Sequence, residues 1–166
     1  MKGIEKISTA DAKEFYNYVN INLKGLITEE RDWLANLSNA SGLLYLLMDQ
    51  INWAGFYLYK EEELILGPFQ GKPACTRIEI GSGVCGTAAN TFTTQVVEDV
   101  NVFPGHIACD PDSRSEIVVP MIRDGKLLGV LDIDSPITNR FNQEDRKYLE
   151  EFVKILLEHT KIPLSY

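Results

Sequence analysis

Apolar residues repeat every three or four positions in the first part of the chain, which is the spacing of one face of a helix. Residues 11–26, "DAKEFYNYVNINLKGL", carry Phe15, Val19 and Leu23 on one face, and Gly25 is a plausible end for this helix. A second apolar stripe follows Thr28, which is a candidate N-cap. This stripe consists of Trp33, Leu34, Leu37, Leu44, Leu47 and Met48. The pattern predicts two amphipathic helices in succession.

The end of the chain shows the strongest helical pattern. Asn142 is a candidate N-cap, and Asp145 follows it three positions on. The apolar face of this segment consists of Tyr148, Leu149, Phe152, Val153, Leu156 and Leu157. We therefore expect a closing helix over residues 142–159.

Strand patterns occupy the middle of the chain. "NWAGFYLY" and "ELILGPF" flank the polar "KEEE" and predict a hairpin, with "TRIEI" as a third strand. "EIVVPMI" and "KLLGVLDID" flank Arg123-Asp124-Gly125, and Asp-Gly favours a tight hairpin turn because its glycine can adopt a positive φ. Helices, then antiparallel hairpins, then a closing helix predict an α+β fold with helices packed on a mostly antiparallel sheet.

The length and charge of the chain limit the kinds of protein that it can be. Its 166 residues fit a single domain. With 16 basic and 24 acidic residues the formal charge is -8, and no basic stripe interleaved with aromatics is present, so no nucleic acid partner is expected. The first ten residues lack the apolar core of a signal peptide, and "GLLYLLM" is too short to span a membrane. We expect a cytoplasmic protein with no membrane partner.

The chain has three cysteines, an odd number that argues against a framework of structural disulfides. Cys75, Cys85 and Cys109 lack C-x-x-C spacing, and only His106-x-x-Cys109 resembles a pair of metal ligands. A zinc site and buried, inert thiols are alternatives. Redox chemistry is favoured, with no metal and no cofactor, because all three cysteines lie in the glycine-rich half of the chain, where backbone amides can stabilise a thiolate. Cys109 lies in the 12-residue loop "VNVFPGHIACDP", and loops of this length are usually functional or mobile.

The segment "GSGVCG", residues 81–86, matches the dinucleotide-binding pattern G-x-G-x-x-G. That pattern acts within a parallel βαβ unit, whereas the surrounding strands here are predicted to be antiparallel. A turn or a helix start through "GTAANTF" is therefore favoured over dinucleotide binding. A helix start would place Cys85 near the positive end of the helix dipole and could bind a small carboxylate.

Alternate positions of one predicted strand carry Trp53, Gly55 and Tyr57, so their side chains project from the same face. Two aromatic walls with a glycine between them would form a slot for a ligand. The alternative is an ordinary core face.

Asp132 and Asp134 likewise share one face at the end of "LLGVLDID". Two carboxylates at alternate positions of one strand repel each other, and Asp is poorly suited to strands. Either this face is solvated, or a ligand ammonium group neutralises it, or one carboxyl is protonated and can act as a general acid.

Four segments together resemble the free methionine-(R)-sulfoxide reductases, which are single-domain GAF proteins. They are "NWAGFYLY", "GPFQGKPACTRIEIGSGVCGTAA", "HIACDPDSRSEIVVPM" and "GVLDIDSP". The similarity runs from about Thr28 to the closing helix. It implies a six-stranded antiparallel sheet flanked by helices, with an N-terminal helix in residues 1–25 and a GAF domain in residues 26–160 of one domain. It also implies a homodimer.

The same resemblance implies roles for individual residues. Cys109 falls on the catalytic cysteine of the family, Cys75 on the resolving cysteine, and Cys85 on an alternative or secondary resolving cysteine. The substrate-binding positions fall on Trp53, Tyr57, Glu116, Asp132 and Asp134.

The chemistry of the residues agrees with these roles. A thiolate can attack the sulfur of a sulfoxide, but the oxygen leaves only when it is protonated, so a carboxyl group with a raised pKa is required nearby. The other carboxylates can hold the ammonium of the free amino acid, and Trp53 can pack against its methyl group. The resulting sulfenic acid is converted to a disulfide by a second thiol, and an external dithiol protein such as thioredoxin resets it.

Two alternatives to this enzyme function follow from the sequence. A GAF domain can be a sensor that binds a small ligand without turnover, because a fold does not determine a function. A thiol-based redox sensor would oxidise Cys109 without consuming a substrate. Turnover of free methionine sulfoxide distinguishes the enzyme from both.

Overall fold

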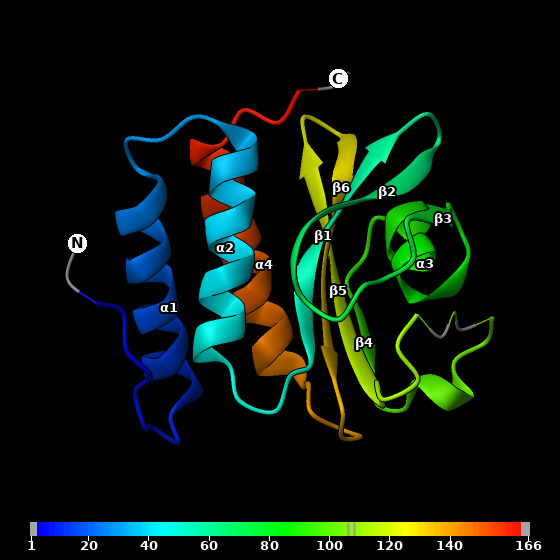
Figure 1. Cartoon of the computed structure of the whole chain (residues 1–166), viewed down its shortest axis with the longest axis horizontal. Coiled ribbons are helices and arrows are strands. Elements are labelled where there is room, and N and C mark those ends of the chain that lie inside the picture. Colours follow the sequence, from blue (N-terminus) through cyan, green and yellow to red (C-terminus); the bar gives the residue numbers. More distant parts are fainter. Residues whose placement is uncertain (1–2, 106, 108, 164–166) are drawn as a thin grey trace.

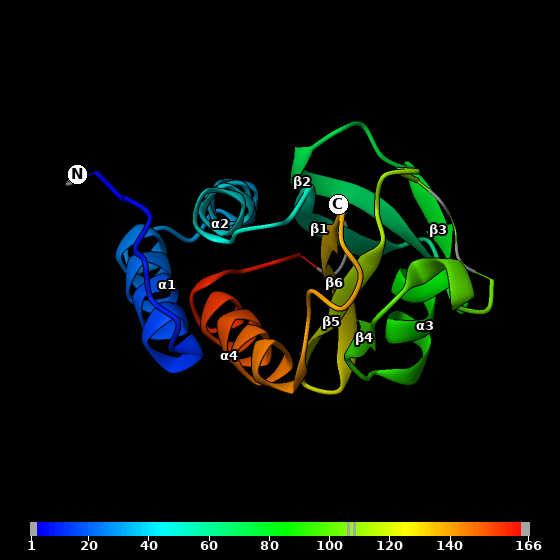
Figure 2. The same ribbon diagram turned by 90° about the horizontal axis from the view of Figure 1, so that it is seen from below.

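The computed structural model describes residues 3–105, 107 and 109–163. Two helices cover one face of a curled antiparallel sheet and a third packs on the outer side of these two, while a shorter helix covers the other face (Figures 1 and 2). Among the described residues the sheet has six strands in the order β3-β2-β1-β6-β5-β4. The predicted α+β class, with a six-stranded antiparallel sheet flanked by helices, is therefore confirmed.

The elements follow the order expected from the sequence. Their bounds are α1 Ala12–Ile27, α2 Trp33–Leu47, β1 Trp53–Lys60, β2 Glu63–Gly71, β3 Arg77–Glu79, α3 Gly83–Thr91, β4 Gln95–Val97, the 3-10 helix η1 Val100–Val102, β5 Ser115–Arg123, β6 Lys126–Ser135 and α4 Gln143–His159.

The junction between α1 and α2 differs from the prediction. α1 continues through Gly25 to Ile27, whose side chain is buried in the core. Thr28 is therefore not the N-cap of α2, because its backbone N–H donates to the Lys24 carbonyl in the last turn of α1. Asp32 caps α2 instead, its carboxylate accepting from the Ala35 N–H at 2.9 Å.

Leu34 also differs from the prediction. It was expected on the apolar face of α2 that packs against the core, but it is 52% exposed. Leu34 lies in the first turn of α2, which begins at Trp33, whereas the polar side chains of Asn36 and Ser41 are buried.

The start of α4 and the second hairpin agree with the prediction. The Asn142 side chain accepts from the N–H groups of Glu144 and Asp145, and the Asp145 carboxylate accepts from the Asn142 N–H, which completes a capping box. Asp124 and Gly125 join β5 to β6 with φ values of 52° and 72°, the positive pair that a tight hairpin turn requires.

β4 was not predicted. Its three residues are paired antiparallel with β5, Gln95 with Val118 and Val97 with Glu116. A strand this short shows too little alternation to be recognised in the sequence.

Alternation along β1 divides the interior into two cores. Ala54, Phe56 and Leu58 face α1, α2 and α4, whereas Trp53 and Tyr57 face α3. The core on the α3 side also contains Cys85, and its partners from β5 and β6 are Val118 and Val130. β1 and α3 therefore present Trp53, Tyr57 and the thiol of Cys85 to the same core.

Candidate functional site

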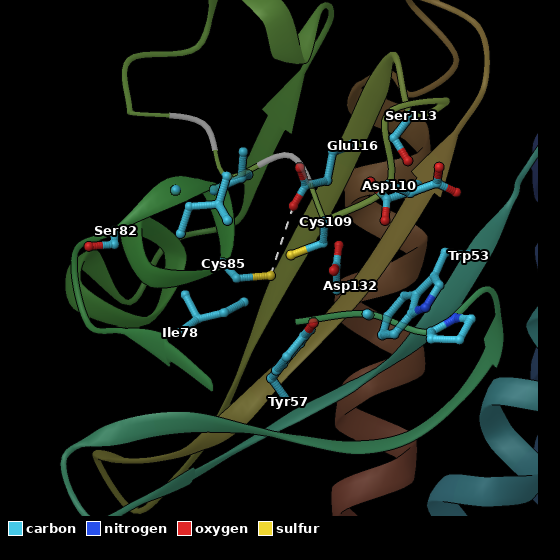
Figure 3. A pocket seen from close by; sticks show the side chains of 16 residues that line it. Trp53, Tyr57, Ile78, Ser82, Cys85, Cys109, Asp110, Ser113, Glu116 and Asp132 are labelled. Atoms are coloured by element: carbon cyan, nitrogen blue, oxygen red, sulfur yellow. Dashed lines mark hydrogen bonds between the residues drawn. The ribbon is translucent and has the colours of Figure 1, made fainter. Parts of the chain in front are cut away.

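A small cavity lies between the sheet and the N-terminal end of α3, with a volume of about 40 Å³ (Figure 3). Seven of the eight predicted site residues line it: Trp53, Tyr57, Cys85, Cys109, Glu116, Asp132 and Asp134. They come from β1, α3, β5, β6 and the loop before β5. Cys75, the eighth, is bonded to Cys109 at the rim of the cavity.

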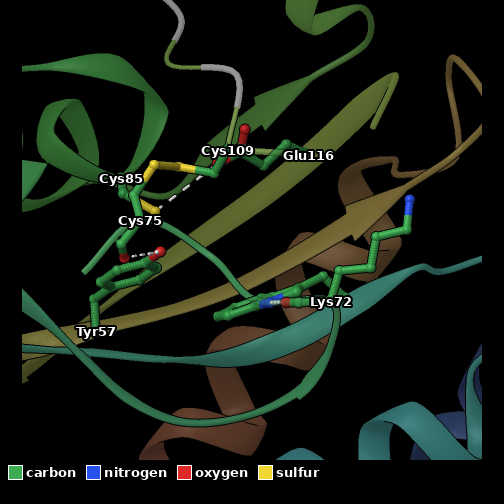
Figure 4. The surroundings of a disulfide bond; sticks show 7 residues. Tyr57, Lys72, Cys75, Cys85, Cys109 and Glu116 are labelled. Atoms are coloured by element: carbon green, nitrogen blue, oxygen red, sulfur yellow. Dashed lines mark hydrogen bonds between the residues drawn. A yellow bond between two sulfur atoms is a disulfide. The ribbon is translucent and has the colours of Figure 1, made fainter. Parts of the chain in front are cut away.

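Cys75 and Cys109 form a disulfide with Cα atoms 5.5 Å apart (Figure 4). Cys75 lies in the loop between β2 and β3, and Cys109 lies in the loop between η1 and β5. The Tyr57 hydroxyl donates a hydrogen bond of 3.0 Å to the Cys75 carbonyl oxygen, which fixes the first loop on β1. Tyr57 therefore holds the cysteine loop as well as lining the cavity.

Cys109 has a histidine three positions before it in the sequence and an arginine five positions after it. His106 lies outside the described residues. Arg114 does not line the cavity, because its guanidinium lies 3.5 Å from the Asp99 carboxylate.

Three carboxyl groups converge on the cavity because of the strand register. Glu116 on β5 is directly opposite Asp134 on β6, and Asp132 lies two positions before Asp134 on the same face. Burial raises the pKa of Asp132 to about 7. Burial, followed by the charges of the neighbouring carboxylates, raises the pKa of Glu116 and of Asp134 well above the usual range. The site therefore favours protonated carboxyl groups, or a cation that neutralises them.

One oxygen of Asp132 also indicates that the cavity is suited to a ligand that donates hydrogen bonds. Within the described part of the chain, Asp132 Oδ1 is buried without a hydrogen-bond partner. A buried carboxylate oxygen without a partner is costly, so a donor from a ligand would be stabilising there.

Cys85 is free and buried, with its thiol 3.8 Å from Glu116 Oε1. Its place in the first turn of α3 was expected to expose it to the positive end of the helix dipole. Burial, together with the charges of Asp132 and Glu116, instead raises the pKa of the Cys85 thiol. Desolvation and the acidic neighbours therefore outweigh the dipole, and Cys85 is a neutral thiol in this form.

One cluster in the described residues could hold a metal ion. Cys85, Glu116 and Asp132 offer ligand atoms within 4.8 Å of one another. One thiol with two carboxylates differs from the paired Cys and His ligands of structural zinc sites. The same atoms can instead surround an ammonium group.

The predicted aromatic slot at Gly55 is closed. The Trp53 and Tyr57 rings stack with centroids 5.9 Å apart, and the Phe69 ring of β2 also stacks with Trp53, with centroids 5.2 Å apart. A Cβ atom on Gly55 would lie 2.3 Å from the Phe69 Cβ and 2.7 Å from the Trp53 ring. Gly55 therefore makes room for these rings, and Trp53 presents its ring to the cavity as a wall.

Several residues of the site were not predicted. Asp110 and Ser113 are buried beside the cavity, and both accept hydrogen bonds from the Asn52 side chain, at 3.2 and 3.1 Å. Asp110 directly follows Cys109 in "HIACDPDSR", but nothing in that loop indicated that its side chain turns inward.

The N-terminal end of α3 forms another wall of the cavity, through Ser82, Gly83 and Val84. Among the described residues the Ser82 side chain makes no capping hydrogen bond. The first N–H groups of a helix have no partner within the helix, so this end offers donors to an anion. The helix start predicted from "GSGVCG" is confirmed, since α3 begins at Gly83.

No helix in residues 3–105, 107 and 109–163 is long and apolar enough to cross a membrane.

Comparison with known proteins gives consistent matches. The GAF domain model matches residues 25–156. The free methionine-R-sulfoxide reductase of Escherichia coli is 51% identical over 140 residues, which cover 84% of this chain and 85% of that protein. The structure of the free methionine-R-sulfoxide reductase from Neisseria meningitidis in complex with its substrate superposes with a TM-score of 0.91 at 43% identity, covering 96% of this chain and 95% of that one. The fRMsr of Staphylococcus aureus in complex with substrate has a TM-score of 0.84 and 55% identity, covering 87% and 94%.

The sheet with helices on both faces and a cavity between the sheet and α3 is a GAF domain, and the chain belongs to that family. Within it, the chain belongs to the free methionine-R-sulfoxide reductases, which are oxidoreductases. The resemblance stated from the sequence is thereby confirmed.

Proposed function

We propose that the protein reduces free L-methionine-(R)-sulfoxide to methionine, with Cys109 as the nucleophile and Cys75 as the resolving cysteine. The observation that carries this proposal is the Cys75–Cys109 disulfide at the rim of a cavity that contains three buried carboxyl groups. The substrate class is supported by the relatives that carry this activity in their names and by the substrate complexes of two of them.

The cavity offers a complementary group for each part of the substrate. Asp132, Asp134 and Glu116 surround the position for the ammonium group, and the unpaired Asp132 oxygen accepts from it. The N–H groups at the start of α3 bind the substrate carboxylate. The Trp53 ring packs against the methyl group of the sulfoxide.

The first chemical step transfers oxygen from the substrate to the enzyme. The Cys109 thiolate attacks the sulfoxide sulfur, and a protonated carboxyl group of the cavity donates a proton to the sulfoxide oxygen. The attack forms a bond between the two sulfurs. The protonated oxygen then passes to the Cys109 sulfur as the S–O bond of the substrate and the new S–S bond break, so that methionine leaves and Cys109 becomes a sulfenic acid. The raised pKa of Asp132, Glu116 and Asp134 supports a carboxyl group as the proton donor.

The second step closes the disulfide. The Cys75 thiol attacks the sulfenic sulfur of Cys109 and water leaves. A thioredoxin-like dithiol protein then reduces the disulfide. Cys85 is a secondary resolving cysteine, since it lies in the same cavity but as a neutral, buried thiol.

The disulfide form stands at the end of this cycle, because Cys109 is bonded to Cys75 and has no thiolate with which to attack a sulfoxide. The substrate is therefore reduced only by the form in which the disulfide is open.

The remaining features of the protein belong to the same proposal. Residues 1–25 extend a GAF domain of residues 26–160 into one folded unit, which acts in the cytoplasm.

The homodimer forms through α2, which has no charged residue and exposes Leu34, Tyr45 and Leu46. Two chains that each carry a charge of -8 associate most easily through an uncharged face. Sedimentation equilibrium should give twice the mass of the chain, and Leu34→Lys with Leu46→Lys should yield monomers.

The decisive experiment is a thioredoxin-coupled assay with free methionine sulfoxide and with its N-acetylated, C-amidated form. We expect turnover of the free R form and very weak turnover of the blocked compound, because a site built to hold a charged ammonium rejects an analogue that lacks it. Equal turnover of the two compounds would show that the carboxyl groups do not bind the ammonium. Binding of the free amino acid without turnover would instead identify a small-ligand sensor.

A further inference from the structure

The loops that carry Cys75 and Cys109 are joined at a second place besides the disulfide. The Lys72 ammonium lies 3.3 Å from Asp110 Oδ1 and forms an ion pair with the Asp112 carboxylate. Lys72 is three residues before Cys75, and Asp110 directly follows Cys109. We call these three residues, Lys72, Asp110 and Asp112, the loop clasp; Figure 4 shows Lys72 extending from the Cys75 loop.

Both sides of the loop clasp are attached to the start of β1. The Trp53 indole N–H donates to the Lys72 carbonyl oxygen at 3.1 Å, and the Asn52 side chain donates to Asp110 Oδ2 at 3.2 Å. The Asp112 N–H also donates to Asp110 Oδ1 at 3.0 Å. These contacts anchor Lys72 and Asp110 to the same part of the sheet. The loop clasp therefore limits how far the two loops can move apart.

The protonation states of the loop-clasp residues favour the ion pairs of Lys72 with Asp110 and Asp112. Hydrogen bonds to Asp112 and Asp110 raise the pKa of Lys72. The Asp112 N–H, and then Lys72, lower the pKa of Asp110, which keeps it ionised although it is buried. The Lys72 side chain is 58% exposed, so its ion pairs contribute little to global stability.

A weak contact can still control a local equilibrium. When the disulfide is open, the Cys75 and Cys109 sulfurs belong to two separate loops, and the rate at which they meet depends on how often these loops are held together. Lys72 holds them through ion pairs that do not use either sulfur. It does not line the cavity, so it can act on the second step without touching the substrate.

We propose that Lys72 is a positioning residue that holds the Cys75 loop against the Cys109 loop, and thereby sets the rate of disulfide closure. This proposal rests on the proposed function. In the step concerned, the Cys75 thiol attacks the sulfenic sulfur of Cys109, the S–S bond forms, the S–OH bond breaks, and the thiol proton leaves with the hydroxyl as water. Cys75 supplies the two electrons that reduce the sulfenic sulfur, and no external reductant takes part.

The test separates the two steps in a single turnover. Reduced wild-type protein and Lys72→Met are mixed with one equivalent of methionine sulfoxide, and quenched samples are analysed for released methionine, for disulfide and for sulfenic acid trapped by dimedone. We expect methionine release to change less than about twofold. Disulfide closure should slow about three- to tenfold, the range for a partly exposed pair of ion contacts, and the dimedone adduct should increase.

Arg77→Met is the matched control. Arg77 follows Cys75 by two residues, its side chain is 54% exposed, and it forms an ion pair of 2.8 Å with Glu63 across β2 and β3. The Arg77→Met substitution removes an exposed ion pair close to Cys75 in the sequence without affecting the Cys109 loop. Lys72→Arg keeps the charge and should restore closure to near the wild-type rate.

A second measurement does not depend on the sulfoxide. The equilibrium between the Cys75–Cys109 disulfide and a dithiothreitol redox buffer gives the effective concentration of the two thiols, which should fall about three- to tenfold in Lys72→Met and remain unchanged in Arg77→Met. If the two variants have the same equilibrium, or if Lys72→Met slows methionine release as much as closure, the proposal is wrong. If wild-type protein releases no methionine, the proposed function fails, while the dithiothreitol equilibrium still tests the role of Lys72.

Discussion

Cys75 and Cys109 are separated by 34 positions in the chain, yet their Cα atoms lie 5.5 Å apart. Each is carried by a loop, and both loops are attached to β1, through the Tyr57 hydroxyl on one side and the Asn52 side chain on the other. Cys85 lies instead in α3, a regular element that holds its thiol within the cavity. The geometry thus distinguishes a pair of loop thiols from a third thiol held in a helix.

Cys109→Ser should abolish turnover of free methionine sulfoxide, because a serine hydroxyl does not supply the thiolate that attacks the sulfoxide sulfur. Folding should be retained, since Cys109 is partly exposed in a loop. The measurement is methionine release in a single turnover, with circular dichroism as the control for folding. Near-normal release by this variant would assign the nucleophile to Cys75 or Cys85.

Peptide mapping after one equivalent of substrate should find Cys75 linked to Cys109, with Cys85 reduced. Cys75→Ser should still release methionine once, because the first step needs only Cys109, but closure through the buried Cys85 thiol should be at least about tenfold slower. Exclusive linkage of Cys85 to Cys109 in the wild-type protein would contradict this assignment.

Asp132→Asn should make the protein more stable at pH 8 than the wild type. Burial raises the pKa of Asp132 from 3.8 to about 7, so the folded state binds this proton more tightly than the unfolded state. The contribution of Asp132 to the free energy of unfolding should therefore be highest below about pH 4, fall between about pH 4 and 7, and stay low above that. Asparagine removes this dependence, and we expect a gain of about 2 kcal/mol at pH 8 that falls by more than half at pH 5.

Urea unfolding at both pH values measures this effect. Asp124→Asn, at an exposed turn, is the control for loss of a carboxyl group. Parallel pH profiles of wild type and Asp132→Asn would show that Asp132 is ionised without cost in the folded protein.

Gly55→Ala should destabilise the protein by about 3 kcal/mol, because the added Cβ would lie 2.8 Å from the Phe69 Cα, which a side-chain rotation cannot relieve. The displaced Trp53 ring should also raise the KM for the sulfoxide. Gly25→Ala is the matched control: its Cβ would have nothing within 4 Å, and alanine in a helix interior should stabilise by about 0.5–1 kcal/mol. Thermal unfolding compares the two, and equal stability of both variants would contradict the close packing at Gly55.

The local signals of the sequence were sufficient for several elements. Three features depend only on residues within a few positions of one another: the apolar face of α4, its Asn142 cap and the Asp124-Gly125 turn. The local sequence pattern is therefore enough to predict their geometry. The cysteines and acidic residues that identify the family were also recognisable, because their types and spacing carry the resemblance.

Neighbouring local signals can compete, and there the sequence was not sufficient. Thr28 and Asp32 are both good N-caps, and the choice between them depends on the burial of Ile27, which extends α1 by two residues beyond Gly25. Similarly, β4 exists because β5 provides a partner for its three residues.

The properties of the site itself were decided by tertiary structure. Alternation alone placed Trp53 and Tyr57 on one face, but the register of β1 with β2 brings Phe69 beside Gly55 and closes the predicted slot. Burial among other carboxyl groups, which no local pattern measures, raises the pKa of Asp132 and keeps Cys85 neutral. The contact between Lys72 and Asp110 joins residues 38 positions apart, and it forms only because the sheet carries both loops to the same edge of the cavity. The sequence by itself therefore determined the elements and the reacting groups, whereas the folded sheet decided which groups meet, in what protonation state, and across which distance.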